Sequence, residues 1–319
     1  MNRPDFPSAS GGIGAVQGLR MSIPLTFRRR YRHEIQAYGF LGPALVLLGL
    51  LMVYPLGQVI RMSFYEVTLR KEAWVGLANY AELLKAPLFW QVLWQTVLFT
   101  VGSVVMHLVI GMGLALLLHT KINAQIRNFL RGLLIIPWLF APTVAGMIWV
   151  LMLSPFGVVN GFLTAIGLLD PNATINWLGS PATSLVSVTA MNIWRAFPFF
   201  MVMLLAGLQA IPEDVYEAAD IDGTTPLQKF WYITIPALSG VIMTIVLLDS
   251  IWTFRAFDPV YVMTGGGPVN SSQVLPTMIY FDAFQRLKFG YASAEAVVMF
   301  LILFAFSVVY VRRAVREIG

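Results

Sequence analysis

Four charged residues lie inside stretches of this 319-residue sequence that are otherwise apolar: Arg195, Asp249, Arg255 and Asp258. A charge among apolar groups is costly unless it is paired or solvated. Such residues therefore form an ion or proton pathway, bind a polar ligand, or pair with one another to fix helix packing. Residue type and position alone leave these uses open.

Asp249 also belongs to a stripe with the spacing i, i+3, i+4 and i+7, which places four residues on one helix face: Asp249, Trp252, Thr253 and Ala256. Sugar hydroxyls need hydrogen bonds, and the C–H face of a sugar stacks on aromatic rings. The stripe therefore suits a sugar. A stripe that only packs helices together would have the same spacing, so both interpretations stand at this point.

The composition indicates which solvent surrounds these residues. Hydrophobic residues make up 58% of the chain, charged residues only 12%, and the mean hydropathy is +0.74. An ordinary soluble domain carries roughly 25% charged residues. This composition nearly excludes a water-soluble enzyme and predicts that lipid covers most of the apolar surface. The absence of cysteine removes disulfides, thiolate catalysis and cysteine metal sites.

Apolar runs of about 20 residues predict an all-α polytopic membrane protein with six transmembrane helices. The predicted six-helix domain covers 38–312, with spans at about 40–60, 89–118, 133–153, 182–210, 236–262 and 291–311. Prolines within the third, fourth and fifth spans predict kinked helices around a central cavity: Pro137, Pro142, Pro198 and Pro259. The segment 154–181 contains no Lys or Arg, which fits an exported loop, and an interfacial helix is expected around Phe162–Leu169.

The distribution of basic residues predicts the orientation. The tail before the first span, the loops after the second and fourth spans and the C-terminal tail hold 13 of the 21 Lys and Arg residues. Cytoplasmic segments carry this excess, so both termini, 1–37 and 313–319, are expected to be cytoplasmic tails. The formal charge of +5 is then a signal for topology and for contact with membrane lipids. No nucleic-acid partner is expected.

One predicted cytoplasmic loop, 211–235, is acidic where such loops are normally basic. Pro212 suits the first turn of a helix, the acidic residues that follow complement its positive end, and Gly223 suits the residue just past its end. This predicts a short helix over Glu213–Asp222. A second helical segment is expected to start at Pro226, before Pro236 opens the next span. A solvated surface loop of two capped helices would show the same pattern.

The same loop resembles the EAA loop of the membrane subunits of binding-protein-dependent ABC importers. The matching residues are Glu217, Ala218 and Ala219, Gly223 six residues after the Glu, and Ile233, Ile235 and Pro236. The family commonly has Leu where Ile235 stands and often Ala where Thr224 stands. In the family this loop forms a coupling helix that docks into a cleft on an ATPase subunit. The resemblance therefore implies ATPase coupling by Glu217, Ala218, Ala219, Asp220 and Gly223.

The resemblance covers the chain from about residue 36 to the C-terminus. Within the family, the chain resembles the carbohydrate importers, and among their subunits the one similar to the larger maltose permease, MalF. Further matching stretches, in the same order and spacing, are Ile136-Pro137, Gly146, Ile148-Trp149, Ala206–Gln209, Ile211-Pro212, Phe257-Asp258, Thr264–Pro268 and Gly290–Ala294. The implied fold is a type I ABC importer permease core. The implied location is the inner membrane of a bacterium or the cell membrane of an archaeon.

The resemblance also implies partners and a substrate path. The partners are a second, MalG-like permease subunit, an ATPase dimer, and a periplasmic or lipid-anchored sugar-binding protein. The substrate-path positions are Asn192, Arg195, Ala196, Asp249, Trp252, Thr253, Ala256, Trp138 and Thr143. Only Asn192 keeps the family's residue type, so the location of the site is carried over and not the identity of the sugar. Arg195 could attract an anionic derivative.

The chain lacks the motifs of an enzyme. It contains no G-x-x-x-x-G-K-[ST], no H-E-x-x-H and no serine-nucleophile elbow. We therefore expect a transport subunit that binds no cofactor, with ATP and magnesium bound by the partner ATPase. The three histidines, His33, His107 and His119, are too scattered to predict a metal site. His107 suits a hydrogen-bonded packing residue better than a proton relay.

The alternative function is an intramembrane enzyme or an ion-coupled secondary transporter, in which Asp249, Arg255 and Asp258 would act as proton or ion groups. Neither of these needs an acidic EAA-like loop. That loop is the feature that favours an ATP-driven importer.

Overall fold

The computed structural model describes residues 40–120 and 123–318, with side chains to residue 313. The predicted N-terminal tail, 1–37, lies outside the described residues. The chain divides into two compact units, Met1–Leu56 and Gly57–Gly319. Phe40–Met62 is one continuous apolar helix of 23 residues, long enough to cross a membrane, and it runs across the division between the units. Within it a π turn, η1 (Gly49–Val53), leads into α2 (Tyr54–Met62).

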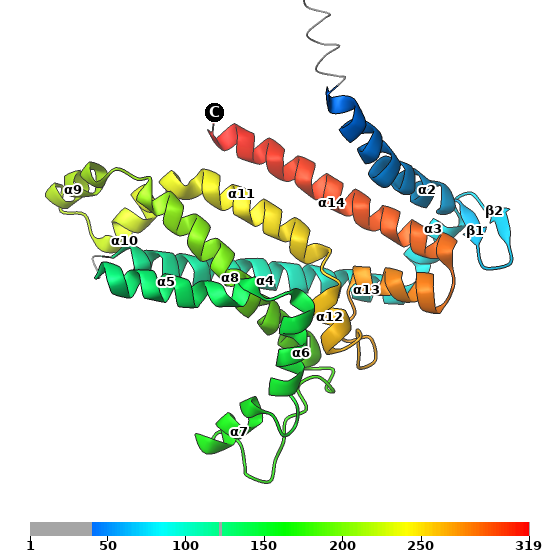
Figure 1. Ribbon diagram of the computed structural model, residues 1–319, viewed down its shortest axis with the longest axis horizontal. Coiled ribbons are helices and arrows are strands. Elements are labelled where there is room, and N and C mark those ends of the chain that lie inside the picture. The colour runs from blue at the N-terminus through cyan, green and yellow to red at the C-terminus, as the bar shows by residue number, and fades with distance from the viewer. Residues whose placement is uncertain (1–39, 121–122, 319) are drawn as a thin grey trace, which may run out of the picture. The chain divides into compact units, whose positions relative to one another are not determined.

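The second unit is built on long helices that run alongside one another, with one shorter helix, α6 (Pro142–Met152), turned away from them (Figure 1). The long helices are α4 (Pro87–His119), α5 (Ala124–Leu139), α8 (Ser184–Gln209), α11 (Ile235–Phe254) and α14 (Phe289–Ile318). The shorter elements are β1 (Tyr65–Val67), β2 (Glu72–Trp74), α3 (Ala78–Lys85), α7 (Val158–Ala165), α9 (Glu213–Ile221), α10 (Pro226–Lys229), η2 (Phe230–Thr234), α12 (Asp258–Met263), α13 (Leu275–Tyr280) and η3 (Phe281–Gln285). In this unit α9 and α10 lie at one end of the long helices and the β1–β2 hairpin at the other.

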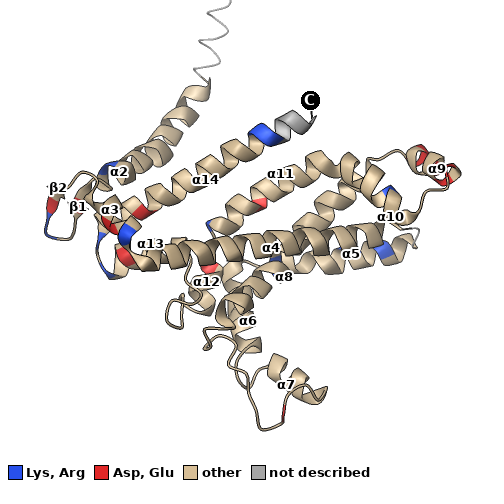
Figure 2. Ribbon diagram, turned by 180° about the vertical axis from the view of Figure 1, so that it is seen from behind, with Lys and Arg blue, Asp and Glu red and all other residues tan. Residues whose placement is uncertain are grey.

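The prediction of an all-α polytopic protein is confirmed, apart from the small hairpin. Among residues 40–120 and 123–318, five helices are long and apolar enough to cross a membrane, and a bent pair, α5 with α6, makes a sixth candidate span if it is counted as one. Charged residues gather mainly at the ends of these helices (Figure 2). Strands β1 and β2 pair antiparallel, with Tyr65 opposite Trp74 and Val67 opposite Glu72.

The third span predicted over 133–153 is broken into two helices. Its two halves, α5 and α6, meet at an angle of 95°. The break falls at Phe140 and Ala141, whose ψ angles of 133° and 140° are extended and not helical. Pro142 explains this geometry, because the ring of a proline disfavours the helical region for the residue before it and a proline has no N–H to continue the helix.

The fifth span is displaced from its predicted bounds of 236–262. One apolar helix runs from Pro226 to Phe254, through the π turn η2, so Pro236 lies inside the helix and does not open it. A π turn is a recognised way of absorbing a local break in the regular helical hydrogen bonds. At the other end the helix stops at Phe254, and α12 begins separately at Asp258, with Pro259 in its first turn. Helix α7, which overlaps the segment expected to form an interfacial helix, begins at Val158, four residues before the predicted Phe162.

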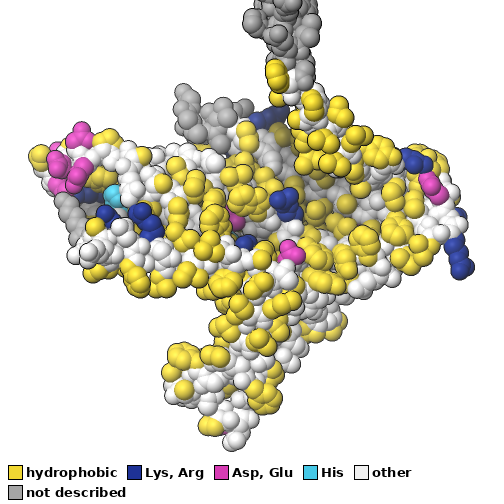
Figure 3. All heavy atoms as spheres, in the orientation of Figure 1, with side chains coloured by type: hydrophobic (Ala, Val, Ile, Leu, Met, Phe, Trp, Pro, Cys, Tyr) yellow, Lys and Arg dark blue, Asp and Glu magenta, His cyan; other side chains and the backbone are white. Residues whose placement is uncertain are grey.

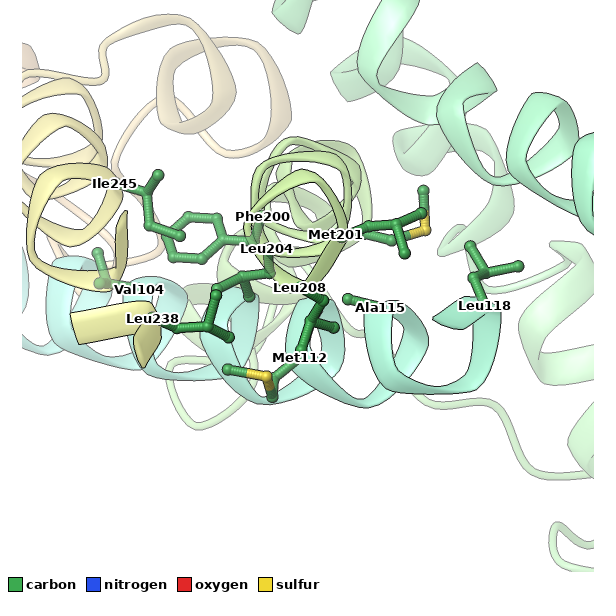
Figure 4. Packing of buried hydrophobic residues seen from close by; sticks show 11 residues of the cluster. Val104, Met112, Ala115, Leu118, Phe200, Met201, Leu204, Leu208, Leu238 and Ile245 are labelled. Carbon is green, nitrogen blue, oxygen red and sulfur yellow. The ribbon is translucent and has the colours of Figure 1, made fainter. Parts of the chain in front are cut away.

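The centre of the second unit is the contact between α4, α8 and α11. Buried apolar side chains from the three helices interlock there (Figure 4), among them Val104, Met112, Phe200, Leu204, Leu208 and Ile245. Gly111 lets α4 approach α8 closely, because a Cβ at this position would lie 2.5 Å from the Cβ of Phe200. On the visible face, hydrophobic side chains cover the long helices (Figure 3). A membrane protein needs this distribution, since lipid solvates its outer surface.

Candidate functional site

A cavity of about 220 Å³ lies among α5, α8 and α11 of the second unit. Its lining residues are Trp138, Asn192, Arg195, Ala196, Phe199, Asp249, Trp252, Thr253 and Ala256. Eight of these are the predicted substrate-path residues, which the structure brings together around one space. Thr143 is the exception, because it lies beyond the break between α5 and α6 and is not part of the lining.

Two helix faces supply most of the lining. On α8, Asn192, Arg195 and Phe199 follow at i, i+3 and i+7. On α11 the predicted stripe supplies Asp249, Trp252 and Thr253, while its last member, Ala256, lies just past the end of the helix at Phe254. Phe199 was missed from the sequence, where it is one of several aromatic residues in an apolar run. Phe199 lies one turn after Arg195 and two turns after Asn192, and this spacing was the signal that could have identified it.

The first wall of the cavity is aromatic. The ring of Phe199 lies 5.6 Å from that of Trp252, edge to face, and 6.0 Å from that of Trp138. Trp138 reaches this position from the last turn of α5, just before the break. Aromatic rings of this kind offer an apolar surface with a negative face, against which the C–H groups of a polar ligand can stack.

The second wall is polar and is hydrogen-bonded to residues behind it. Asp249 Oδ2 lies 2.7 Å from His107 Nδ1, and Asp249 Oδ1 accepts a long hydrogen bond of 3.4 Å from the hydroxyl of Thr253. The side-chain amide of Asn192 donates to Ser103 Oγ at 3.0 Å. All of these side chains are buried, so their polar atoms are oriented by protein partners.

Arg195 is the one basic residue in the lining. Its buried Nε has no hydrogen-bond partner among the described residues. The guanidinium interacts electrostatically with Asp249 and with Asp258 at the start of α12. Arg255 and Asp258 are exposed at the turn between α11 and α12 and do not line the cavity. The four charges singled out in the sequence therefore do not form one buried chain.

The predicted coupling residues lie at the end of the unit where α9 and α10 are found (Figure 1). Helix α9 ends one residue before the predicted Asp222, and Gly223 follows with a φ of +71°, the left-handed conformation that glycine adopts without strain. Glu217, Ala218 and Asp220 are exposed, while Ala219 is buried. The exposed face of this helix is therefore acidic.

Several contacts hold α9 against the following helix. Tyr216 shares a hydrogen bond of 2.9 Å with Thr234, and Asp220 forms an ion pair with Lys229. Thr225 and Gln228 cap the start of α10 reciprocally. A cleft of about 1280 Å³ opens here, and its lining includes Glu217, Asp220 and Arg127. No group of three or more potential metal ligands occurs among residues 40–120 and 123–318.

Comparison with known families places residues 107–317 in one family, described as the binding-protein-dependent transport system inner membrane component. The sequence is 36% identical to the sulfoquinovosyl glycerol transport system permease protein SmoG of Agrobacterium fabrum, covering 88% of this chain and 90% of that one. It is 32% identical to the trehalose/maltose transport system permease protein MalF of Thermococcus litoralis, covering 92% and 98%.

Solved structures share the fold. A chain from the crystal structure of a bacterial ABC transporter involved in the import of the acidic polysaccharide alginate matches with a TM-score of 0.80. The match covers 91% of this chain and 98% of that chain, at 20% sequence identity. The arrangement of helices is thus that of an ABC importer permease.

Proposed function

The chain belongs to the family of binding-protein-dependent transport system inner membrane components, and we propose that it is one of two nonidentical permease subunits of an ATP-driven importer for a sugar or sugar derivative. It is a multi-pass protein of the cell inner membrane. A second, MalG-like permease subunit, an ATPase dimer and a sugar-binding protein complete the assembly. Both termini lie in the cytoplasm in this proposal.

The observation that carries the sugar assignment is the cavity with one aromatic and one polar wall. Phe199, Trp252 and Trp138 offer ring surfaces, and Asn192, Asp249 and Thr253 offer hydrogen-bonding groups in the same lining. A sugar presents C–H faces and hydroxyl groups and can use both walls at once. The names of two relatives, which refer to sulfoquinovosyl glycerol and to trehalose and maltose, point to the same class of ligand.

In this proposal the chain itself catalyses no reaction. ATP and magnesium bind to the partner ATPase, and α9 transmits the closure of the ATPase dimer to the long helices. The exposed acidic face around Glu217 supports this role, because it offers a charged surface at the end of the unit where α9 adjoins the helix Pro226–Phe254. A transporter of this kind alternates between two states that contact the ligand differently.

Reconstitution of the complete complex in proteoliposomes tests this function. We expect uptake of a sugar to require two components: its binding protein, and ATP on the side of the membrane where the ATPase lies. Uptake that continues without ATP and follows an imposed proton or sodium gradient would instead establish the ion-coupled transporter. The same preparation assayed with a panel of neutral and anionic sugars identifies the substrate.

A further inference from the structure

His107 on α4 connects the three central helices from behind the cavity. Its side chain is fully buried, with Nδ1 2.7 Å from Asp249 Oδ2 on α11 and Nε2 3.2 Å from the main-chain oxygen of Asn192 on α8. Its ring packs 5.6 Å from that of Phe200. His107 does not line the cavity, so the sugar path alone does not account for an ionisable ring at this position.

The two contacts fix the number of protons that the pair must hold. A carbonyl oxygen only accepts hydrogen bonds, so Nε2 carries a hydrogen to bond Asn192. If the ring were neutral, Nδ1 would then have a lone pair, and this lone pair would face a lone pair of the Asp249 carboxylate. A favourable contact at 2.7 Å requires one further proton between the two atoms. Both arrangements that satisfy the geometry, an imidazolium beside a carboxylate and a neutral imidazole beside a carboxylic acid, contain this proton.

We propose that His107 and Asp249 hold one shared proton and that His107 thereby positions Asp249 as part of a neutral, hydrogen-bonding wall. This proposal rests on the proposed function in taking the cavity as the sugar path. The pair has no net charge in either arrangement, so the wall presents hydrogen-bonding oxygen to hydroxyl groups without attracting a free cation. Asp249 Oδ1, which accepts from Thr253, is the oxygen left for a ligand.

The proposal predicts a specific dependence on pH. Arg195 from α8 interacts electrostatically with Asp249 of the pair and also with Asp258 from the start of α12. The His107 ring also contacts Phe200 and the main-chain oxygen of Asn192, neither of which ionises. Removing the shared proton by raising the pH leaves the ring with a single hydrogen, which can bond either Asp249 or the main-chain oxygen of Asn192 but not both, so one of the two contacts is lost.

Nitrogen NMR of the complete complex labelled with ¹⁵N-histidine reads the proton count directly. The His107 signals are those lost in His107→Gln. If that variant does not assemble, they are selected in the wild-type complex by magnetisation transfer to ¹³C-labelled aspartate carboxyl groups. We expect Nε2 to be protonated at pH 7 and Nδ1 to be hydrogen-bonded. An unprotonated Nε2 at pH 7 would overturn the proposal, because the pair would then lack the additional proton.

The pH profile of sugar-stimulated ATPase activity gives a second readout. In the wild-type complex we expect the apparent KM for the loaded binding protein to rise about tenfold at alkaline pH, the effect of losing roughly one hydrogen bond. His107→Gln and Asp249→Asn should each abolish this rise, because neither can exchange the shared proton. His33→Gln is the control, because it changes a histidine outside the described residues. This variant should keep the rise in apparent KM. A rise that persists in His107→Gln would contradict the proposal.

The two proposals fail separately. A complex without sugar-stimulated ATPase activity at any pH would refute the importer function, and the nitrogen spectrum would still decide whether His107 and Asp249 share a proton. A normal importer with an unprotonated His107 Nε2 would refute only the shared proton.

Discussion

The rings of Phe199 on α8 and Trp252 on α11 meet edge to face, with their centroids 5.6 Å apart. Trp138 from α5 extends the same surface, at 6.0 Å from Phe199. Three helices therefore contribute to one aromatic wall of the cavity, and a change at any of the three rings alters the surface offered to a ligand.

Trp252→Leu should weaken sugar transport without unfolding the protein. Trp252 is 45% exposed, so shortening its side chain leaves no closed void in the core. An aromatic contact contributes about 0.5–1.5 kcal/mol, so we expect the apparent KM for the loaded binding protein to rise from a few-fold to about tenfold. Sugar uptake at varied concentration measures this change.

Trp94→Leu is the matched control for that variant. Trp94 lies on α4, is 61% exposed and does not line the cavity. Equal losses in Trp94→Leu and Trp252→Leu would show that the effect is a general one of removing tryptophan from a membrane helix, and would contradict a ligand-binding wall.

Arg195→Ala tests whether the cavity's one basic residue binds the ligand. A hydrogen bond to a charged group is worth about 1.5–3 kcal/mol, so direct binding predicts a loss of apparent affinity of roughly 10- to 100-fold. Arg195→Lys keeps the charge without the planar donor geometry and should lose less. Unchanged affinity and rate in Arg195→Ala would refute direct binding by this residue.

Gly111→Ala should destabilise the contact between α4 and α8. The added Cβ would lie 2.5 Å from the Cβ of Phe200 and 3.0 Å from the backbone nitrogen of Met201. Overpacking of this kind typically costs about 1–3 kcal/mol. Thermal unfolding in detergent should show a lower midpoint for Gly111→Ala, whereas Gly113→Ala, where nothing lies within 4 Å of the new atom, should leave the midpoint near the wild-type value.

Gly223 tests the geometry that follows α9. Its φ of +71° is strained for a residue with a side chain, and a left-handed conformation costs about 1–2 kcal/mol. Gly223→Val should therefore shift the end of the helix and lower the ATPase stimulation by the loaded binding protein. Gly223→Asn is the control, because asparagine tolerates this conformation, and it should retain more stimulation than Gly223→Val. The reverse order would contradict a role for this backbone geometry.

The sequence was sufficient to predict the long helices and most of the cavity lining. The apolar runs predicted the helices because lipid allows few charged residues between their ends. The spacing placed Asp249, Trp252 and Thr253 on one face of α11, whereas Asn192, Arg195 and Ala196 on α8 were predicted from the family resemblance. That the lining binds a sugar stays a prediction.

Other features depend on tertiary contacts that no local pattern reveals. Hydropathy continues without interruption through Phe140 and Ala141, so the prolines predicted a kink but not a 95° break. The pair of His107 with Asp249 joins residues 142 positions apart, and neither residue alone indicates the other. The sequence did favour a hydrogen-bonded, packed His107 over a proton relay, and its ring is buried with both nitrogens in contact.

The central claim is that this permease couples a sugar to a partner ATPase through α9. The most direct test is the ATPase activity of the co-purified complex with and without the sugar-loaded binding protein, for the wild type and for Glu217→Lys. We predict stimulation by one sugar in the wild type, and its loss or a failure to assemble in Glu217→Lys. Normal stimulation together with normal transport in Glu217→Lys would contradict the coupling role of this helix.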